Sequence, residues 1–212
     1  MPSVKRLLGA WLAVATLSAS AAGLESLEAF IKTARSGRAD FVQVVTAPAK
    51  DAEAPRSKTS SGSFEFSRPN RFKFIYRKPF EQSIVADGQT LWLYDVDLNQ
   101  VTARKQSQVL ASTPAALIAS APELRALQTD FALTDAPAKD GIEWVLATPR
   151  ARDSALQSIR VGLRGGELAV LEILDSFGQR SVLTFTRFEL NPVLPVKAFE
   201  FRAPAGADVI RQ

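Results

Sequence analysis

The sequence predicts a mainly β (α+β) protein in which an antiparallel sheet curls into a barrel or half-barrel. About eleven short segments show the period-two alternation of strands, and only three short helical segments interrupt them, without βαβ alternation. The 212 residues are 46% hydrophobic and 23% charged, which is ordinary globular usage. We therefore expect one domain with a sizeable core.

The first residues have the organisation of a secretory signal peptide. Lys5 and Arg6 precede an apolar run over residues 7–17, and small residues follow up to Ala22. A membrane anchor would need about 20 apolar residues, roughly twice the length of this run. The sequence thus predicts a signal peptide over residues 1–21 that is cleaved on export, and a single domain over residues 22–212.

Composition excludes several functions. Cleavage removes two of the 26 basic residues and leaves 24 against 22 acidic ones, a near-neutral balance that argues against nucleic-acid binding. Cysteine is absent, so the chain has no disulfide and no thiol to accept a lipid anchor. Histidine is also absent, which excludes Ser-His and Cys-His nucleophile pairs and histidine metal ligands. We expect a protein that is not an enzyme and uses no cofactor or metal.

An amphipathic helix opens the mature chain. Apolar side chains fall at helical spacing at Leu24, Leu27, Phe30, Ile31 and Ala34. Gly37 stands where a helix C-terminal glycine belongs. A strand is expected around Phe41, and residues 46–61, rich in Ala, Pro, Ser and Lys, are expected to form a long loop.

The next block alternates aromatic with polar residues in two adjacent segments. The aromatic positions are Phe64 and Phe66 in the first segment and Phe72, Phe74 and Tyr76 in the second. Arg68-Pro69-Asn70 separates them and marks a turn, because proline cannot donate to a strand ladder. The block therefore predicts a hairpin with one aromatic face. Taken alone, such a face is more typical of ordinary sheet packing than of a cavity.

The rest of the chain alternates strands with turns. A helix is expected from Pro114 to residue 119, interrupted by Pro122 before a short piece over residues 123–127. Further strands are expected over residues 81–86, 90–94, 99–104, 130–134, 142–148, 158–163, 168–174, 180–190 and 199–202.

Two motifs that resemble ligand sites have simpler explanations. The run Gly162-Leu163-Arg164-Gly165-Gly166 has neither the lysine nor the spacing of a phosphate loop and predicts a hairpin turn. Asp95, Asp97 and Asn99 alternate as in a calcium loop, but Gln100 occupies the place of its essential glycine, so a solvated turn is expected. The number of acidic residues does not exclude a pair of carboxylates for glycoside hydrolysis, although each candidate residue lies in a predicted turn.

Several short motifs, spread along the mature chain, point to a known family. They are Phe41-Val42-Gln43, Arg68-Pro69-Asn70, Phe72-Lys73-Phe74, Asp87-Gly88-Gln89-Thr90-Leu91-Trp92, the Asp-x-x-Gly-Gln pattern at residues 175–179, and Phe199-x-Phe201-x-x-Pro204-x-Gly206. Together they resemble the LolA family of outer-membrane lipoprotein carriers. The resemblance implies an unclosed antiparallel β-barrel of about eleven strands, whose hydrophobic cavity is covered by a lid of short α-helices.

The resemblance also implies a transport route. The carrier would accept triacylated lipoproteins from an inner-membrane ABC lipoprotein-releasing complex, shield their acyl chains while crossing the periplasm, and deliver them to the outer-membrane lipoprotein receptor LolB. We expect this carrier to act as a monomer. A lipid- or lipoprotein-sensing envelope protein, or a small-lipid binding protein, would share these apolar features, and both remain alternatives.

On this basis the lipid-binding surface is expected to combine the aromatic strand face with apolar lid residues. Its members are Phe64, Phe66, Phe72, Phe74, Tyr76, Trp92, Leu27, Phe30, Leu117 and Ile118. Arg68 matches the motif arginine of the family, which implies that it controls the lid. The alternative for Arg68 is a solvated turn charge.

Overall fold

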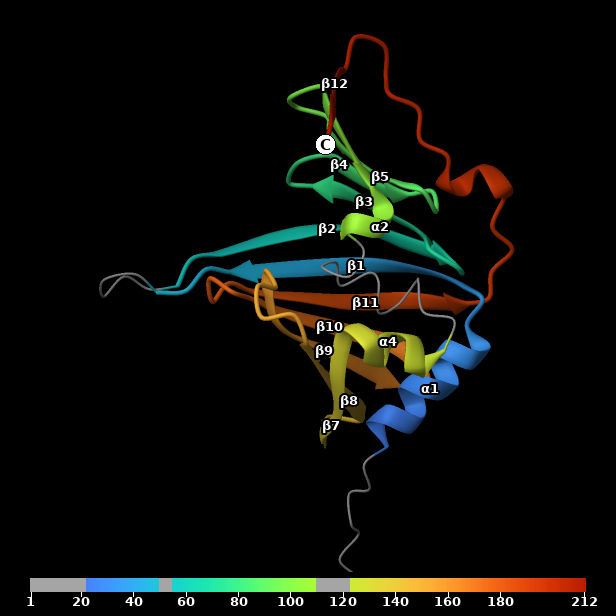
Figure 1. The fold of residues 1–212 in the computed structure, drawn as a ribbon, viewed down its shortest axis with the longest axis vertical. Coiled ribbons are helices and arrows are strands. Elements are labelled where there is room, and N and C mark those ends of the chain that lie inside the picture. Colours follow the sequence, from blue (N-terminus) through green and yellow to red (C-terminus); the bar gives the residue numbers. More distant parts are fainter. Residues whose placement is uncertain (1–21, 50–54, 110–122) are drawn as a thin grey trace, which may run out of the picture.

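The computed structural model describes residues 22–49, 55–109 and 123–212, which form one sheet and a few short helices (Figure 1). The predicted signal peptide lies outside these residues. None of the described helices has the length and apolar character needed to span a membrane. The helices are α1 (Gly23–Thr33), α2 (Gln106–Val109), α4 (Leu124–Asp130) and the 3-10 helix η2 (Val196–Phe199). The strands are β1 (Ser36–Thr46), β2 (Ser57–Ser67), β3 (Arg71–Lys78), β4 (Gln82–Ala86), β5 (Thr90–Asp95), β6 (Gln100–Lys105), β7 (Phe131–Lys139), β8 (Ile142–Pro149), β9 (Leu156–Arg164), β10 (Glu167–Asp175), β11 (Arg180–Leu190) and β12 (Asp208–Arg211).

All twelve strands belong to one sheet, in the order β12-β6-β5-β4-β3-β2-β1-β11-β10-β9-β8-β7. Neighbouring strands are antiparallel, apart from the parallel pair β12 and β6. In the described part of the chain, β12 and β7 end the order and do not pair with each other, so the sheet is not closed. This confirms the predicted mainly β fold with an unclosed sheet and few short helices.

The helix α1 covers one end of the sheet, against β7, β8 and β9 (Figure 1). Its apolar stripe is buried, and the Ala34 backbone N–H donates to the Phe30 carbonyl at the helix end. The expectation that Gly37 ends this helix is wrong, because Gly37 lies inside β1. A side chain there would run into the Phe66 ring, so the close approach of that ring is what requires glycine.

Two other sequence expectations are also corrected. Residues 57–61, expected in a loop, form the first half of β2, which pairs with β1 along its full length. Residues 200–202, expected in a strand, follow η2 as an extended segment, and the last strand forms later at β12. The predicted helical piece over residues 123–127 corresponds to α4, whereas the helix predicted from Pro114 lies outside the described residues.

The face of the sheet on which α1 packs, here called the inner face, carries the main core. Phe64 pairs with Phe74 across β2 and β3, and their ring centroids are 4.5 Å apart. Phe66 pairs with Phe72 one step further along, and the ring of Phe30 in α1 lies 6.2 Å from that of Phe66. These aromatic contacts fasten the helix to the centre of the sheet.

The opposite face, here called the outer face, is covered from β3 towards β6 by η2 and the segment that follows it, residues 196–207 near the C-terminus (Figure 1). The ring of Phe201 stacks on Trp92 at a centroid distance of 5.2 Å. Phe199 and Val101 are almost completely buried. The protein therefore has a second, smaller apolar core on its outer face.

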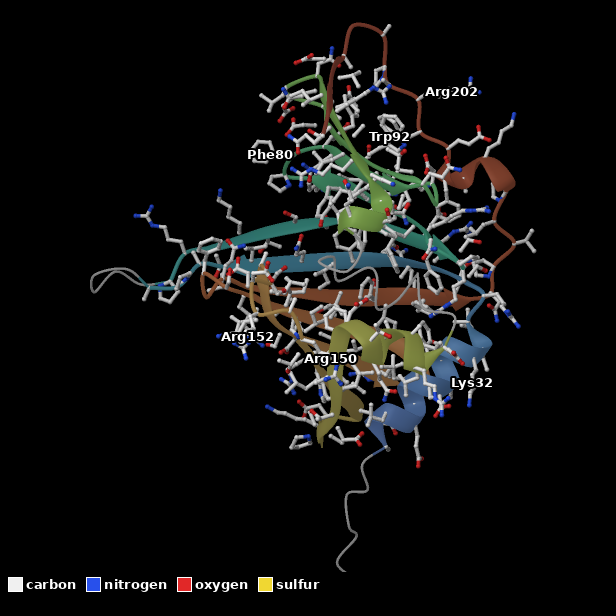
Figure 2. The ribbon with its side chains drawn as sticks, in the orientation of Figure 1. Lys32, Phe80, Trp92, Arg150, Arg152 and Arg202 are labelled. Carbon is white, nitrogen blue, oxygen red and sulfur yellow. The ribbon has the colours of Figure 1, made fainter. Side chains whose placement is uncertain are left out.

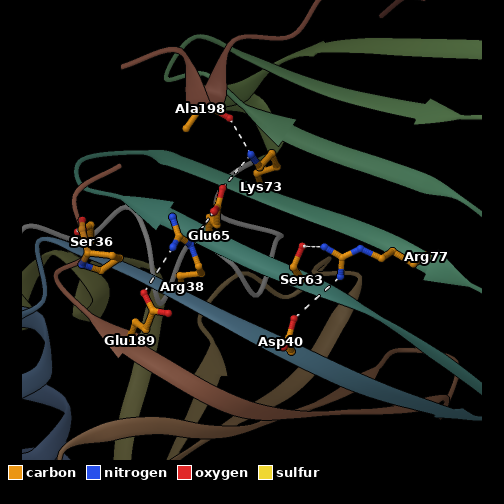
Figure 3. Close-up of polar contacts among 10 residues, drawn as sticks. Ser36, Arg38, Asp40, Ser63, Glu65, Lys73, Arg77, Glu189 and Ala198 are labelled. Atoms are coloured by element: carbon orange, nitrogen blue, oxygen red, sulfur yellow. Dashed lines mark hydrogen bonds and ion pairs between the residues drawn. The ribbon is translucent and has the colours of Figure 1, made fainter. Parts of the chain in front are cut away.

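Charged residues of the outer face tie three strands to this C-terminal segment (Figure 3). The Glu65 carboxylate accepts from Arg38 Nε at 2.9 Å and pairs with Lys73 Nζ at 2.8 Å. Lys73 Nζ also donates to the Ala198 carbonyl at 3.0 Å. Burial tends to raise the pKa of Glu65, but the hydrogen bonds and charges of Lys73 and Arg38 outweigh it and hold the pKa below its usual value.

Candidate functional site

A cavity of about 330 Å³ opens on the inner face between the two halves of the sheet. Its size lies at the lower end of the range of small-molecule sites, which are mostly apolar with few polar groups. Apart from one glutamine, all of its lining residues are aliphatic or aromatic. They are Gln43, Phe72, Phe74, Tyr76, Ile84, Leu91, Leu93, Leu171, Ile173 and Leu183.

Strand alternation and register bring these side chains to one wall. Phe74 in β3 lies opposite Ile84 in β4, which in turn lies opposite Leu93 in β5. The other wall comes from β10 and β11, where Leu171 lies opposite Leu183. Side chains two residues apart in a strand share a face, so the residues two positions before or after these pairs, such as Tyr76, Leu91 and Ile173, also face the cavity. The site is thus built by residues far apart in sequence.

Three of the predicted lipid-contacting residues, Phe72, Phe74 and Tyr76, line this cavity. Phe64 and Phe66 lie beside it, fully buried in the aromatic cluster that supports its wall. Leu27 and Phe30 belong to the same core through α1 and are 2% exposed. The remaining two predicted lid residues, Leu117 and Ile118, lie outside the described residues.

Trp92 is a correction to the predicted set, because it lies on the outer face. It pairs with Val85 and Ala103, and its Nε1 donates to Asp87 Oδ2 at 2.9 Å. Figure 2 shows its ring beside the C-terminal segment, in agreement with the stacking on Phe201. Its neighbours Leu91 and Leu93 occupy the inner face instead. The alternation in β5 was recognisable in the sequence, but which set faces inward depends on the pairing with β4.

Sequence reasoning also missed the far wall of the cavity. Leu171, Ile173 and Leu183 come from β10 and β11, which lie next to β1 in the sheet although they are remote from it in sequence. Their alternation predicted strands but contained no signal for a cavity, because any half-buried strand shows the same pattern. Gln43 was missed as well, although it stands in the Phe41-Val42-Gln43 motif.

Arg68 lies in the turn between β2 and β3 and contacts the core instead of projecting into solvent. Its guanidinium carbon lies 5.7 Å from the centroid of the Phe66 ring and 5.9 Å from that of Phe30 in α1. Burial, together with the nearby charge of Arg35, lowers the pKa of Arg68 to about 10, so it remains a cation at neutral pH. Arg68 thus joins the β2–β3 turn to the helix that covers the sheet.

A second cavity, of about 510 Å³, adjoins the first and is here called the mouth. Gln43 and Tyr76 line both cavities. The mouth also contains the acidic side chains Glu81, Asp95 and Asp97 and the two exposed apolar side chains Phe80 and Leu98. A long ligand can therefore place its apolar part in the inner cavity while its remainder leaves through a polar opening.

The motifs considered for phosphate and calcium binding have structural roles in the described chain. Gly165 and Gly166 adopt positive φ angles of 59° and 81° in the turn between β9 and β10, which confirms the predicted hairpin. Asp95 Oδ1 accepts from the Leu98 N–H at 3.1 Å, which stabilises the turn between β5 and β6. Among the described residues, no group of three or more acidic side chains is arranged to hold a metal ion.

Comparison with known proteins assigns the family. Residues 32–202 match the family described as "Outer membrane lipoprotein carrier protein LolA". The outer-membrane lipoprotein carrier protein of Albidiferax ferrireducens is 73% identical over 198 residues, which cover 92% of this chain and 93% of that protein. The corresponding protein of Leptothrix cholodnii is 52% identical over 195 residues, which cover 92% and 88%. Among solved structures, a LolA superfamily protein of Nitrosomonas europaea aligns with a TM-score of 0.48 and 16% identity, over 84% of this chain and 97% of that chain. On its sequence, the chain belongs to the LolA family of outer-membrane lipoprotein carrier proteins.

Proposed function

We propose that this protein carries lipoproteins to the outer membrane and shelters their acyl chains in the inner-face cavity. The mainly apolar cavity formed by β1, β3, β4, β5, β10 and β11 is the observation that supports this function most directly. Burial of each methylene is worth about 0.8 kcal/mol, so a chain of about fourteen methylenes represents on the order of 10 kcal/mol of transfer free energy. A lipoprotein that leaves a membrane therefore needs such a shelter.

The proposed route starts at the inner membrane and crosses the periplasm. Residues 1–21 direct export and are removed, and residues 22–212 act as a single carrier domain. An ABC releasing complex loads triacylated lipoproteins, and the receptor LolB accepts them at the outer membrane. The proposed lipid contacts are the cavity-lining residues Phe72, Phe74 and Tyr76, supported by Phe64, Phe66, Leu27 and Phe30.

A charge placed in the cavity tests this function. We expect Phe72→Glu and the less deeply buried Leu93→Glu to lose lipoprotein cargo, because a carboxylate in the apolar wall must be desolvated or protonated, which costs several kcal/mol. The matched control is Val44→Glu, which places the same charge on the outer face, where Val44 is 36% exposed.

The measurement is co-purification of exported protein with envelope lipoproteins, identified by mass spectrometry, after thermal melting has shown that each variant folds. The intact mass of the purified protein also tests the removal of residues 1–21. Retention of triacylated lipoproteins by folded Phe72→Glu and Leu93→Glu at the level of Val44→Glu would show that this cavity does not hold the cargo.

A further inference from the structure

Gln43 and Tyr76 are the two side chains with polar tips in the wall of the inner cavity, and both lie where it meets the mouth. All other lining residues of the inner cavity are Phe, Ile or Leu. An acyl chain buried in this cavity has its own polar group, the linkage to the rest of the lipid, at the end nearest the mouth. The polar linkage of the ligand and the two polar side chains therefore lie at the same depth, where the inner cavity meets the mouth.

Gln43 is held in place by a hydrogen bond across the sheet. Its Nε2 donates to Ser181 Oγ at 2.6 Å, between β1 and β11. Ser181 is 8% exposed, so this bond is largely shielded from water. The bond uses the donor side of the Gln43 amide, and among the described residues its Oε1 has no hydrogen-bond partner. Gln43 thus presents a fixed acceptor at the junction.

Tyr76 supplies a donor at the same junction. Its ring packs edge-on against Phe41, with centroids 5.1 Å apart. Burial raises the pKa of Tyr76 to about 12, so the hydroxyl stays protonated at every physiological pH. Within the described chain the hydroxyl also lacks a hydrogen-bond partner and remains available to a ligand.

We infer that Gln43 and Tyr76 form a subsite for the amide that links an acyl chain to its carrier molecule. In this subsite the Gln43 Oε1 accepts from the amide N–H, and the Tyr76 hydroxyl donates to the amide carbonyl. The inference rests on the proposed function, because it assigns the acyl chain to the inner cavity. An ester has the carbonyl but no N–H, so it satisfies Tyr76 and leaves the Gln43 oxygen without a partner.

This pairing makes the cavity selective for linkage chemistry as well as for chain length. A site built to hydrogen-bond a ligand N–H disfavours the analogue that lacks it, since its own acceptor is then left unpaired. If Gln43 served only to bond Ser181 and support the pairing of β1 with β11, amide and ester ligands would bind equally well. The two roles of Gln43 therefore predict different ratios of amide to ester affinity, which can be measured.

The experiment compares two probes that differ at one atom. One is N-hexadecanoylglycine methyl ester, and the other is its analogue in which oxygen replaces the linking N–H. Dissociation constants are measured by displacement of an environment-sensitive fluorescent fatty acid from the exported protein. We expect the wild type to bind the amide about five- to tenfold more tightly than the ester, which corresponds to one hydrogen bond.

Three variants test which side chain produces the preference for the amide. Gln43→Leu should lower the preference for the amide to about one or below, because the amide N–H then has no acceptor. Gln179→Leu, which alters an exposed glutamine between β10 and β11, should keep the wild-type ratio. Tyr76→Phe should weaken both probes by a similar factor and leave the ratio unchanged, because both ligands have the carbonyl. Should Gln43→Leu fail to fold in thermal melting, Ser181→Ala replaces it and should lower the ratio by freeing the Gln43 amide.

The outcomes separate the inference from the function on which it rests. Equal binding of amide and ester by the wild type, or a wild-type ratio in Gln43→Leu or its replacement Ser181→Ala, overturns the linkage subsite and leaves the carrier function standing. Failure of both probes to displace the fluorescent fatty acid from the wild type contradicts the proposed acyl-chain cavity itself.

Discussion

Arg68 shows how one side chain can join a turn to a helix on the inner face. Its guanidinium lies over the rings of Phe30 and Phe66, with burial that a solvated turn arginine would not have. Such contacts are worth about 0.5–2 kcal/mol each. The helix α1 is held on the sheet mainly by its buried apolar stripe. We therefore propose that Arg68 affects how α1 lies over the inner face more than it affects the stability of the fold.

The substitution Arg68→Leu tests this role. We expect a folded protein whose unfolding free energy changes by about 1 kcal/mol, since leucine keeps apolar contact with both rings but loses the cation. The rate of cargo transfer to the outer-membrane acceptor should change more than stability does. Arg71→Leu, which alters an exposed arginine at the start of β3, is the control. A wild-type transfer rate in Arg68→Leu would show that the contacts of Arg68 with α1 do not affect cargo transfer.

Single residues also show how far the sequence predicts the site. The alternation of Phe72, Phe74 and Tyr76 correctly predicts one shared face, because period two is a property of the local chain. The same rule could not place Trp92 correctly, because alternation divides the side chains of β5 between two faces without showing which face is the inner one. Leu171 could not be predicted as cavity wall at all, because its position depends on a pairing between strands remote in sequence.

At the scale of elements, the C-terminal segment is the part that local patterns describe least well. Proline and glycine residues break any periodicity there, and its order comes from contacts with β3 to β6. Phe201 stacks on Trp92, and Ala198 accepts from Lys73. The strand β12 then joins β6 in parallel, a pairing that no hairpin signal could predict.

The ion pairs of Glu65 couple this segment to the strands in a pH-dependent way. Because the pKa of Glu65 is lowered in the folded state, its contribution is present above the unfolded value near 4.5 and is lost as pH falls through the folded value. We expect Glu65→Gln to cost about 1 kcal/mol at neutral pH and to flatten the loss of stability below pH 4.5.

The measurement for this prediction is urea denaturation at a series of pH values from 7 to 3. Glu189→Gln is the matched control, because it removes the other acidic partner of Arg38. The side chain of Glu189 is 59% exposed, so its ion pair is more accessible to water than that of Glu65. The control should follow the wild type. An acid-induced loss of stability as steep in Glu65→Gln as in the wild type would show that the Glu65 ion pairs do not contribute to it.

At the scale of the whole molecule, an unclosed sheet provides a cavity without a separate binding domain. The inner face is filled by α1 and the aromatic cluster at one end and left open beside β4 and β5 at the other. The same sheet therefore supplies a rigid core and a ligand site. Because the half-buried residues Ile84, Leu91 and Leu93 line that open end, an acyl ligand should bury apolar surface that the empty protein leaves accessible.

Ligand binding should therefore stabilise the whole fold. At a free ligand concentration of about one hundred times the dissociation constant, binding to the native state alone adds about 2.7 kcal/mol. For a chain of this length that corresponds to a rise in Tm of roughly 5–10 °C. The check is thermal melting of the exported protein with N-hexadecanoylglycine methyl ester below its micellar concentration. Leu93→Glu, with a charge in the cavity wall, should show a much smaller rise, and Val44→Glu the full one. An equal rise in all three proteins would place the bound acyl chain elsewhere than in this cavity, because only Leu93 among the altered positions lines it.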